Sequence, residues 1–352
     1  MFKTEIIPYS LRFKLPAGTS RGVYHEHRVW YLLFRDSEDA THFGIGECAP
    51  LPGLSCDDDA GYAETLAAFC RVTEEKQRVE TELLRNYPSI LFGLETALRH
   101  YQQRSWQLWE SPFSRGAGGI TINGLVWMGE QTSMMQQIES LLERGFSCIK
   151  LKIGAIDFER ELELLRFIRS SYAANKVELR VDANGAFSSS DAVERVRRLA
   201  ELDIHSIEQP IQAGEWQEMA RLCASSPLPV ALDEELIGIS DPTEKRKLLE
   251  TIRPQYIILK PSLHGGISGC NEWVSLAEAM HIGWWITSAL ESNIGLNSIA
   301  QWCATLGNAL PQGLGTGTLY SNNIPLPLEI RGEQLWFNPE GSFPEMNTDR
   351  YE

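Results

Sequence analysis

Short apolar runs alternate with longer amphipathic segments through the middle of the chain. Runs such as CIKLKIG, LRVDANG and YIILKPS have the composition of buried strands, and each is followed by a segment with helical periodicity. The alternation repeats about every 25 to 30 residues, the length of one strand, one helix and two short loops. Because alternating strands and helices form a parallel sheet that about eight units close, the pattern predicts a βα barrel over residues 119–319.

The first part of the chain has a different pattern, in which strands come before helices. The expected elements are strands at 3–14 and 28–34, a Gly- and Pro-rich loop (FGIGECAPLPGLS) from Phe43, and helices at about 57–77 and 89–101. This order indicates an α+β domain at residues 1–118. The tail, residues 320–352, is strand-rich without a helix of its own, and we expect it to return and complete this first domain.

Composition and charge are those of an ordinary soluble globular protein. Of 352 residues, 43% are hydrophobic and 22% charged, and no run approaches the roughly 18 apolar residues that cross a bilayer. The N-terminus lacks the apolar stretch of a secretion signal, so a cytoplasmic location is expected. The net charge of −15 argues against a nucleic-acid partner. Seven scattered cysteines without a Cys-x-x-Cys pair are expected to be reduced thiols.

Six of the predicted barrel strands end on a polar residue. These residues are Lys152, Asp182, Glu208, Asp233, Lys260 and Ser288. Active sites of βα barrels lie at the C-terminal ends of the strands, so the six side chains are expected to converge on one mouth. Two lysines and three carboxylates would then share one site.

Lysines are predicted on two sides of this mouth. Lys150 and Lys152 are two residues apart on one strand, so both side chains enter the barrel. Ammonium groups this close are expected to lower each other's pKa, which makes one of them a base near neutral pH. Lys260 lies four strands away and is predicted to face Lys152. A simple ion pair of Lys260 with Asp233 or Glu234 is the alternative.

Three carboxylates from consecutive strands, Asp182, Glu208 and Asp233, supply hard oxygen ligands without histidine or cysteine. Such a set favours Mg²⁺, which keeps open positions for water or substrate oxygens. A helix N-cap explains any one of them alone, but three at matched positions favour the metal. Asn184 is expected to orient a ligand from behind. Arg180 is predicted to hold a substrate anion or a carboxylate, with a buried ion pair as the alternative.

The segment His25-Glu26-His27 resembles a metal-binding His-x-His pair. It precedes a predicted strand, and among later histidines only His205 and His264 lie near a strand end of the barrel. We interpret the segment as a surface turn.

Together these motifs resemble the enolase superfamily, in its muconate-lactonizing-enzyme subgroup. The resemblance is carried by Lys-x-Lys on the second strand, Asp-x-Asn on the third, IEQP on the fourth, LDEE on the fifth and a lysine on the sixth. Within the subgroup, LRVDANG, KPSLHGG, SALESNIGLNSIAQW and GLGTGTLYSNNIP look most like the o-succinylbenzoate synthases of menaquinone biosynthesis. The resemblance covers nearly the whole chain, including GECAPLPG and the loop from Thr19 to Gly22.

The resemblance implies a modified TIM barrel, (β/α)₇β, with an α+β capping domain, and a lyase active on a small carboxylate. It implies Mg²⁺, which Mn²⁺ can replace, on Asp182, Glu208 and Asp233. In this family pattern Lys152 removes the α proton of 2-succinyl-6-hydroxy-2,4-cyclohexadiene-1-carboxylate, then protonates the departing hydroxyl, and Lys260 stabilises the enediolate. The implied substrate contacts and supporting residues are Lys150, Arg180, Ser288, Thr19 and Arg21, with Asn184 and Glu234 behind the metal ligands.

Three other functions stay open at this point. A dipeptide epimerase or N-acylamino-acid racemase would use the same lysines and metal, although the Asp-x-Asp of the dipeptide epimerases is missing between Ser288 and Ser292 and from Gly315 to Gly317. A muconate-type cycloisomerase is a further possibility. A barrel without catalysis, with its polar residues serving as caps and ion pairs, would be expected to show gaps in the series of strand ends, and none is present.

Overall fold

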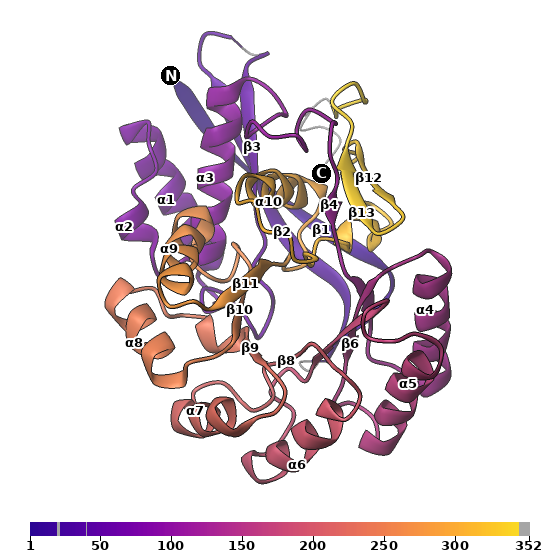
Figure 1. Cartoon of the computed structure of the whole chain (residues 1–352). Coiled ribbons are helices and arrows are strands. Elements are labelled where there is room, and N and C mark those ends of the chain that lie inside the picture. Colours follow the sequence, from indigo (N-terminus) through magenta and orange to yellow (C-terminus); the bar gives the residue numbers. More distant parts are fainter. Residues whose placement is uncertain (20–21, 40, 345–352) are drawn as a thin grey trace.

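The computed structural model describes residues 1–19, 22–39 and 41–344. It contains an antiparallel sheet with helices at one end of the chain and a curved parallel sheet surrounded by helices in the middle (Figure 1). This arrangement confirms the predicted barrel with an α+β cap. No helix in the described part of the chain is long and apolar enough to cross a membrane.

The cap is an antiparallel three-stranded sheet with helices against it. Its elements are β1 (Phe2–Thr19), β2 (Gly22–Asp36), β3 (Phe43–Cys48), α1 (Tyr62–Lys76), α2 (Thr81–Leu84) and α3 (Pro88–Gln103). The apolar faces of the sheet and of α1 and α3 form one buried cluster that includes Phe34, Leu66 and Leu94.

The prediction of a loop beginning at Phe43 was wrong for Phe43–Cys48, which is strand β3, and correct for the rest of the segment, Ala49 to Ser55, which contains no strand or helix. Its glycines serve close packing rather than a turn. A Cβ atom on Gly44 would lie 2.3 Å from the carbonyl oxygen of Ala97, and one on Gly46 would lie 2.0 Å from that of Gly93. Only glycine therefore lets α3 cross this strand so closely.

The barrel is a seven-stranded parallel sheet with the order β11-β10-β9-β8-β7-β6-β5. Its strands are β5 (Gly124–Val126), β6 (Cys148–Lys152), β7 (Glu178–Asp182), β8 (Ser206–Glu208), β9 (Val230–Leu232), β10 (Tyr256–Leu259) and β11 (Gly283–Ile286). Its helices are α4 (Gln131–Glu143), α5 (Phe158–Ser171), α6 (Ser189–Ala200), α7 (Trp216–Ser225), α8 (Pro242–Ile252), α9 (Gly266–Ala279) and α10 (Asn293–Thr305).

The gap between β11 and β5 is closed by a short segment rather than a full strand. Gln312 bridges to Ile122 and Gly313 to Thr287, both in parallel orientation. The expected last strand at 313–319 is therefore extended only at its start, since Thr316–Thr318 forms the 3₁₀ helix η2.

The C-terminal segment divides its contacts between the cap and the barrel. Tyr320, Ile324 and Leu326 join a buried cluster with cap residues such as Leu11 and Tyr31. The following hairpin, β12 (Leu328–Arg331) and β13 (Gln334–Phe337), pairs instead with β4 (Ile120–Thr121) at the start of the barrel.

Two cap glutamates orient the cap over the barrel mouth. Glu47 of β3 accepts hydrogen bonds of 2.8 Å from the backbone N–H groups of Ser292 and Gly295 at the start of α10. Glu95 of α3 accepts a bond of 2.7 Å from the N–H of Ile267 at the start of α9. Because helix N-termini carry unpaired N–H groups and partial positive charge, these carboxylates fix the cap to the side where β10 and β11 end.

The interpretation of His25–His27 as a surface turn was also wrong. The segment lies within β2, and His27 is buried with its ring nitrogens 3.0 Å from the carbonyl oxygen of Leu290 and 3.1 Å from that of Pro50. Burial lowers the pKa of His27. The side chain thus links a cap loop to a barrel loop and is not a metal ligand.

Candidate active site

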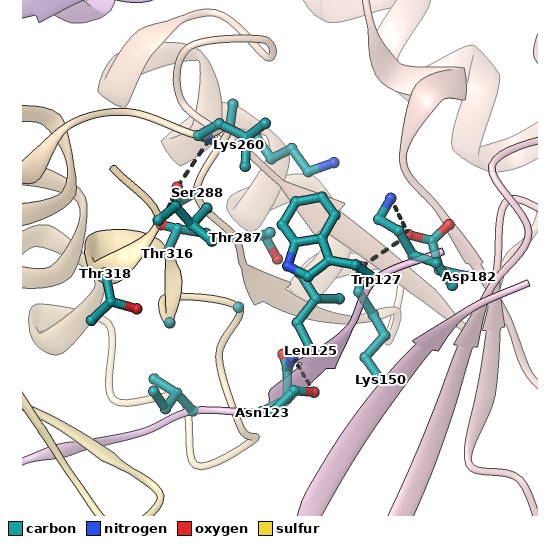
Figure 2. A pocket seen from close by; sticks show the side chains of 18 of the residues that line it. Asn123, Leu125, Trp127, Lys150, Asp182, Lys260, Thr287, Ser288, Thr316 and Thr318 are labelled. Atoms are coloured by element: carbon teal, nitrogen blue, oxygen red, sulfur yellow. Dashed lines mark hydrogen bonds and ion pairs between the residues drawn. The ribbon is translucent and has the colours of Figure 1, made fainter. Parts of the chain in front are cut away.

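A cavity of about 250 Å³ opens at the C-terminal ends of the barrel strands, beneath the cap. Figure 2 shows lysine, carboxylate and hydroxyl side chains gathered around it. Sequence-predicted site residues that line it are Lys150, Lys152, Asp182, Asn184, Glu234, Lys260 and Ser288. The cavity has an apolar roof, named here the cap roof. It consists of Tyr24, Leu51 and Leu54 of the cap together with Leu290 and Leu319 of the barrel loops.

The two lysines of β6 contact the ends of the next strands. The ammonium group of Lys150 donates to Glu208 Oε2 at 2.7 Å and to Asp182 Oδ2 at 3.1 Å. Lys152 Nζ lies 3.3 Å from Asp182 Oδ2 and donates to Asn184 Oδ1 at 2.9 Å. Strand register explains this, since Lys152 pairs with Asp182, and Asp182 with Glu208, across neighbouring strands.

Lys260 approaches from the other side of the mouth. It follows β10, which three strands separate from β6, and its ammonium group donates to Asp233 Oδ2. Its backbone N–H donates to His264 Nδ1 at 2.9 Å, which leaves the proton of a neutral imidazole on Nε2. That atom lies 4.0 Å from Asp233 Oδ1. Burial lowers the pKa of His264 to about 3, so the ring is neutral.

The prediction that Lys150 and Lys152 lower each other's pKa does not hold for Lys150. Burial alone would lower the pKa of Lys150, but the charges of Asp182 and Glu208 outweigh it and raise the pKa above its ordinary value. For Lys260, burial is likewise outweighed by Asp233, and its pKa is raised. Opposite charges therefore govern these lysines more than the like charge beside them.

The carboxyl groups of the site also have shifted pKa values. Burial and the charge of Asp182 raise the pKa of Glu208 well above its ordinary value. Burial, with the charge of Asp233, raises the pKa of Glu234 to about 7. Burial opposes ionisation of Asp182 as well, yet Lys150 and Lys152 keep the pKa of Asp182 low. At Glu208 and Glu234, burial and the neighbouring carboxylates therefore outweigh the positive charge of the lysines.

The donor set suits a hard divalent cation. Glu208 Oε1 and Asp233 Oδ1 are buried without a hydrogen-bond partner, and both belong to the predicted ligands. Carboxylate oxygens on adjacent strands are the ligands that Mg²⁺ prefers. In the described residues no three carboxylate, histidine or cysteine side chains stand close enough to hold a metal as they are. Ammonium groups contact all three carboxylates instead, so binding requires the flexible lysine side chains to withdraw.

Asn184 connects Lys152 to the acidic side chain of Glu234. Its backbone has φ of 44°, its side-chain oxygen accepts from Lys152, and its Nδ2 donates to Glu234 Oε1 at 2.9 Å. Its backbone N–H donates to Asp182 Oδ1 at 3.0 Å. A non-glycine residue whose backbone is held in the left-handed region by three polar contacts is a feature of functional loops.

Arg180 does not reach the cavity, contrary to the prediction of a substrate contact. Its fully buried guanidinium donates to Glu178 Oε1 at 2.7 Å and to the carbonyl oxygen of Pro311 at 2.9 Å, and it lies 4.2 Å from the ring centroid of Trp285. The side chain does enter the barrel, but two residues before Asp182 and therefore one layer below the mouth. The alternative of a buried ion pair is correct.

The predicted substrate contacts of the cap loop fall outside what is described. Arg21 lies outside the described residues, as does the side chain of Thr19. Ser288 lines the cavity, where its hydroxyl lies 2.8 Å from Thr316 Oγ1 and accepts from the N–H of Leu290 at 3.1 Å.

Sequence reasoning missed three residues that shape the site. Trp127 at the end of β5 projects into the cavity, and His264 stands behind Asp233. Gln209 accepts at 3.2 Å from the N–H groups of Asp233 and Glu235, which positions the loop after β9. The signal for Trp127 was its place at the end of the first barrel strand, and for Gln209 its position next to Glu208 in IEQP.

Comparisons with known proteins agree with this architecture. Residues 133–336 match the family described as enolase C-terminal domain-like. An o-succinylbenzoate synthase of Desulfotalea psychrophila is 45% identical over 92% of this chain and 96% of its own. A crystal structure of MenC from the same organism superimposes with a TM-score of 0.81 at 39% identity over 95% of this chain and 99% of that one.

A substrate-liganded complex of the L-Ala-D/L-Glu epimerase from Bacillus subtilis also superimposes, with a TM-score of 0.81. It is 19% identical over 96% of each chain, a likeness of fold alone.

Proposed function

The chain belongs to the enolase superfamily, in the enolase C-terminal domain-like family, and from this membership we propose that it is a Mg²⁺-dependent o-succinylbenzoate synthase. The observation that carries the proposal is the similarity to the synthase of D. psychrophila, which extends over almost the full length of both chains. The cavity with lysines on two sides and carboxylates between them agrees with it.

In the proposed reaction Lys152, as the free amine, takes the α proton of 2-succinyl-6-hydroxy-2,4-cyclohexadiene-1-carboxylate. The electron pair of that C–H bond moves into the carboxylate and forms an enediolate. Lys152, now an ammonium group, returns its proton to the hydroxyl as the C–O bond breaks, so water leaves and the ring becomes aromatic. A lysine base with Mg²⁺ is a known pattern of this superfamily.

The other charged residues hold the carboxylate while negative charge grows on it. Lys260 faces the substrate from the far side, where the positive charge of its ammonium group favours the enediolate. Lys150 lies two residues before Lys152 on β6 and adds positive charge beside it. Asn184 holds Lys152 in place by its 2.9 Å bond.

Asp182, Glu208 and Asp233 would hold the metal, with the unpartnered oxygens of Glu208 and Asp233 as the first available ligands. When bound, Mg²⁺ supplies positive charge beside the substrate carboxylate, which lowers the barrier most where the second negative charge develops. Substitution by Mn²⁺ and a cytoplasmic location remain predictions from the sequence.

A dipeptide epimerase is disfavoured by one observation at the last strands. Glu291 is the one acidic residue in the segments Ser288–Ser292 and Gly315–Gly317, where the Asp-x-Asp would lie. It is fully buried and accepts from Ser262 Oγ at 2.6 Å and from the N–H of Ala289 at 2.7 Å. It is therefore committed to the loop and does not present a free carboxylate to a peptide ammonium.

The test follows loss of the cyclohexadiene substrate by ultraviolet absorbance, with Mg²⁺ and after its removal by chelation. We expect turnover that chelation abolishes and added Mg²⁺ restores. Absence of turnover together with epimerisation of L-Ala-L-Glu would replace the synthase with the epimerase. Racemisation of N-succinylamino acids, measured in parallel, identifies an acylamino-acid racemase.

A further inference from the structure

Trp127 occupies a position between the base and the cap. It follows the last residue of β5, and the Nζ atom of Lys152 lies 6.0 Å from the centroid of its ring. On its other side the half-buried indole packs against the apolar cluster that contains Leu51 and Leu290 of the cap roof. Figure 2 shows the ring projecting into the cavity among the charged side chains.

The backbone of Trp127 is held by a side chain of the neighbouring helix. Its N–H donates to Gln137 Oε1 at 2.9 Å, and the Nε2 of Gln137 lies 3.5 Å from its carbonyl oxygen. Gln137 belongs to α4, which packs on the outside of the barrel. These bonds fix the backbone from which the indole projects, and packing against the apolar cluster holds the ring as a wall of the cavity.

A wall of this kind distinguishes unsaturated, nearly flat rings from saturated or acyclic substrates. A carbon that Lys152 deprotonates lies about 3 to 3.5 Å from its Nζ atom in a reactive pose. Because Trp127 lines the same cavity with its ring centroid 6.0 Å from that nitrogen, a ring that carries this carbon can lie within the roughly 4.5 to 7 Å at which aromatic rings attract by offset stacking or edge contact. The sp² carbons of a cyclohexadiene or aromatic ring present a flat π face to the indole, whereas a saturated ring or an acyclic side chain does not.

We infer that Trp127 is a specificity-determining residue that selects substrates whose reacting carbon belongs to an unsaturated, nearly flat ring over those in which it belongs to a saturated ring or an acyclic chain. This inference rests on the proposed function, since it concerns the same site and reaction. The alternative is that the indole only fills the apolar cluster, in which case its removal weakens every ligand alike.

The test compares two ligands that differ in ring planarity, 2-succinylbenzoate and 2-succinylcyclohexane-1-carboxylate, by calorimetric titration in the presence of Mg²⁺. We expect the wild type to prefer the planar ligand and Trp127→Leu to reduce the ratio of the two affinities by about tenfold. Trp127→Phe, which keeps an aromatic face, retains most of the preference. Leu263→Val changes the same cluster at a residue that does not line the cavity, and leaves the ratio unchanged.

Equal weakening of both ligands in Trp127→Leu, with circular dichroism of a folded protein, overturns the inference. Turnover by the wild type is measured separately. If the wild type is active and Trp127→Leu leaves the affinity ratio unchanged, ring selection is refuted and the proposed function stands. An inactive wild type that still shows the Trp127-dependent preference refutes the proposed function and supports ring selection.

Discussion

The ammonium group of Lys152 donates a hydrogen bond of 2.9 Å to the side-chain oxygen of Asn184, whose own backbone has φ of 44°. The bond places the nitrogen that we propose as the base at a defined point of the mouth, next to Asp182. It also depends on a residue that tolerates the left-handed region, where asparagine is more frequent than other non-glycine residues.

Replacing Asn184 by glycine keeps this backbone conformation and removes the bond. We expect kcat for the proposed dehydration to fall about 10- to 100-fold with little change in thermal stability, because the side-chain bonds to Lys152 and Glu234 are lost while the backbone conformation is kept. The matched control is His281→Gly, an exposed residue with φ of 58° far from the site in sequence, which should leave kcat unchanged. A normal kcat in Asn184→Gly would show that Lys152 needs no such support.

Removing either lysine of the mouth should abolish turnover without unfolding the protein. For Lys152→Ala and Lys260→Ala we expect a loss on the order of 10³-fold or more, because the proton transfer and the charge opposite it are each lost. Steady-state rates and circular dichroism measure the two effects. Near-normal turnover in one variant would mean that its assigned role is wrong.

Metal binding should depend on the three carboxylates. Asp182→Asn and Glu208→Gln are expected to weaken Mg²⁺ binding at least tenfold in calorimetric titration, because a neutral amide is a poorer ligand for a hard dication. Glu235→Gln, a neighbouring acid that bonds to Gln209 and Gly214, is the control. Unchanged affinity in both ligand variants would place the ion elsewhere.

Arg180 should matter for stability and not for substrate binding. Arg180→Met is expected to lower the free energy of unfolding by about 3 kcal/mol, because Glu178 loses its partner and the carbonyl of Pro311 its donor. Breaking the exposed pair of Arg198 and Glu159 should leave the free energy of unfolding nearly unchanged, because solvent screens it. Urea denaturation and KM measure the two properties, and a raised KM in folded Arg180→Met would restore Arg180 as a substrate contact.

The buried carboxyl group of Asp57 predicts a pH dependence of stability. Burial raises its pKa to about 6, and its Oδ2 accepts from the N–H of Ser89 at 2.9 Å. Because burial favours the neutral carboxyl group, the pKa of Asp57 is higher in the folded protein than in the unfolded chain. Its contribution to the free energy of unfolding is therefore fully present below about pH 4 and is lost as pH rises through 6. Asp57→Asn does not titrate in this range. Its free energy of unfolding relative to that of the wild type should therefore be about 3 kcal/mol higher at pH 7.5 than at pH 4.

Urea denaturation across this pH range measures the difference between Asp57→Asn and the wild type. Asp58→Asn, at the exposed neighbouring position, is the matched control. A difference for Asp57→Asn that stays constant with pH would exclude the expected titration.

The strand ends of the barrel were predictable because strand geometry is local. In a strand, residues two apart share a face, and in a parallel sheet the carboxyl ends meet at one edge. The order of apolar runs and polar ends in the sequence was therefore sufficient to predict that Lys152, Asp182 and Lys260 line one cavity. It was also sufficient for the barrel with its cap.

Misread elements were those whose meaning depends on a distant part of the chain. Gly44 and Gly46 belong to a strand because α3 crosses it closely, and local punctuation does not reveal that helix. His27 is buried because the loop at Leu290 covers it. In both cases the packing partner lies far along the sequence, in α3 for the glycines and at Leu290 for His27.

The sequence by itself determined the periodic fold, the convergence of the charged residues and the family, since each follows from local pattern. Only the tertiary structure decided which partner each charge has. Arg180 and Asp182 lie on the same face of one strand, yet the first is sealed beneath the mouth by Glu178 and Pro311 and the second meets two lysines. Depth in the barrel separates them, and depth arises only when all strands close together.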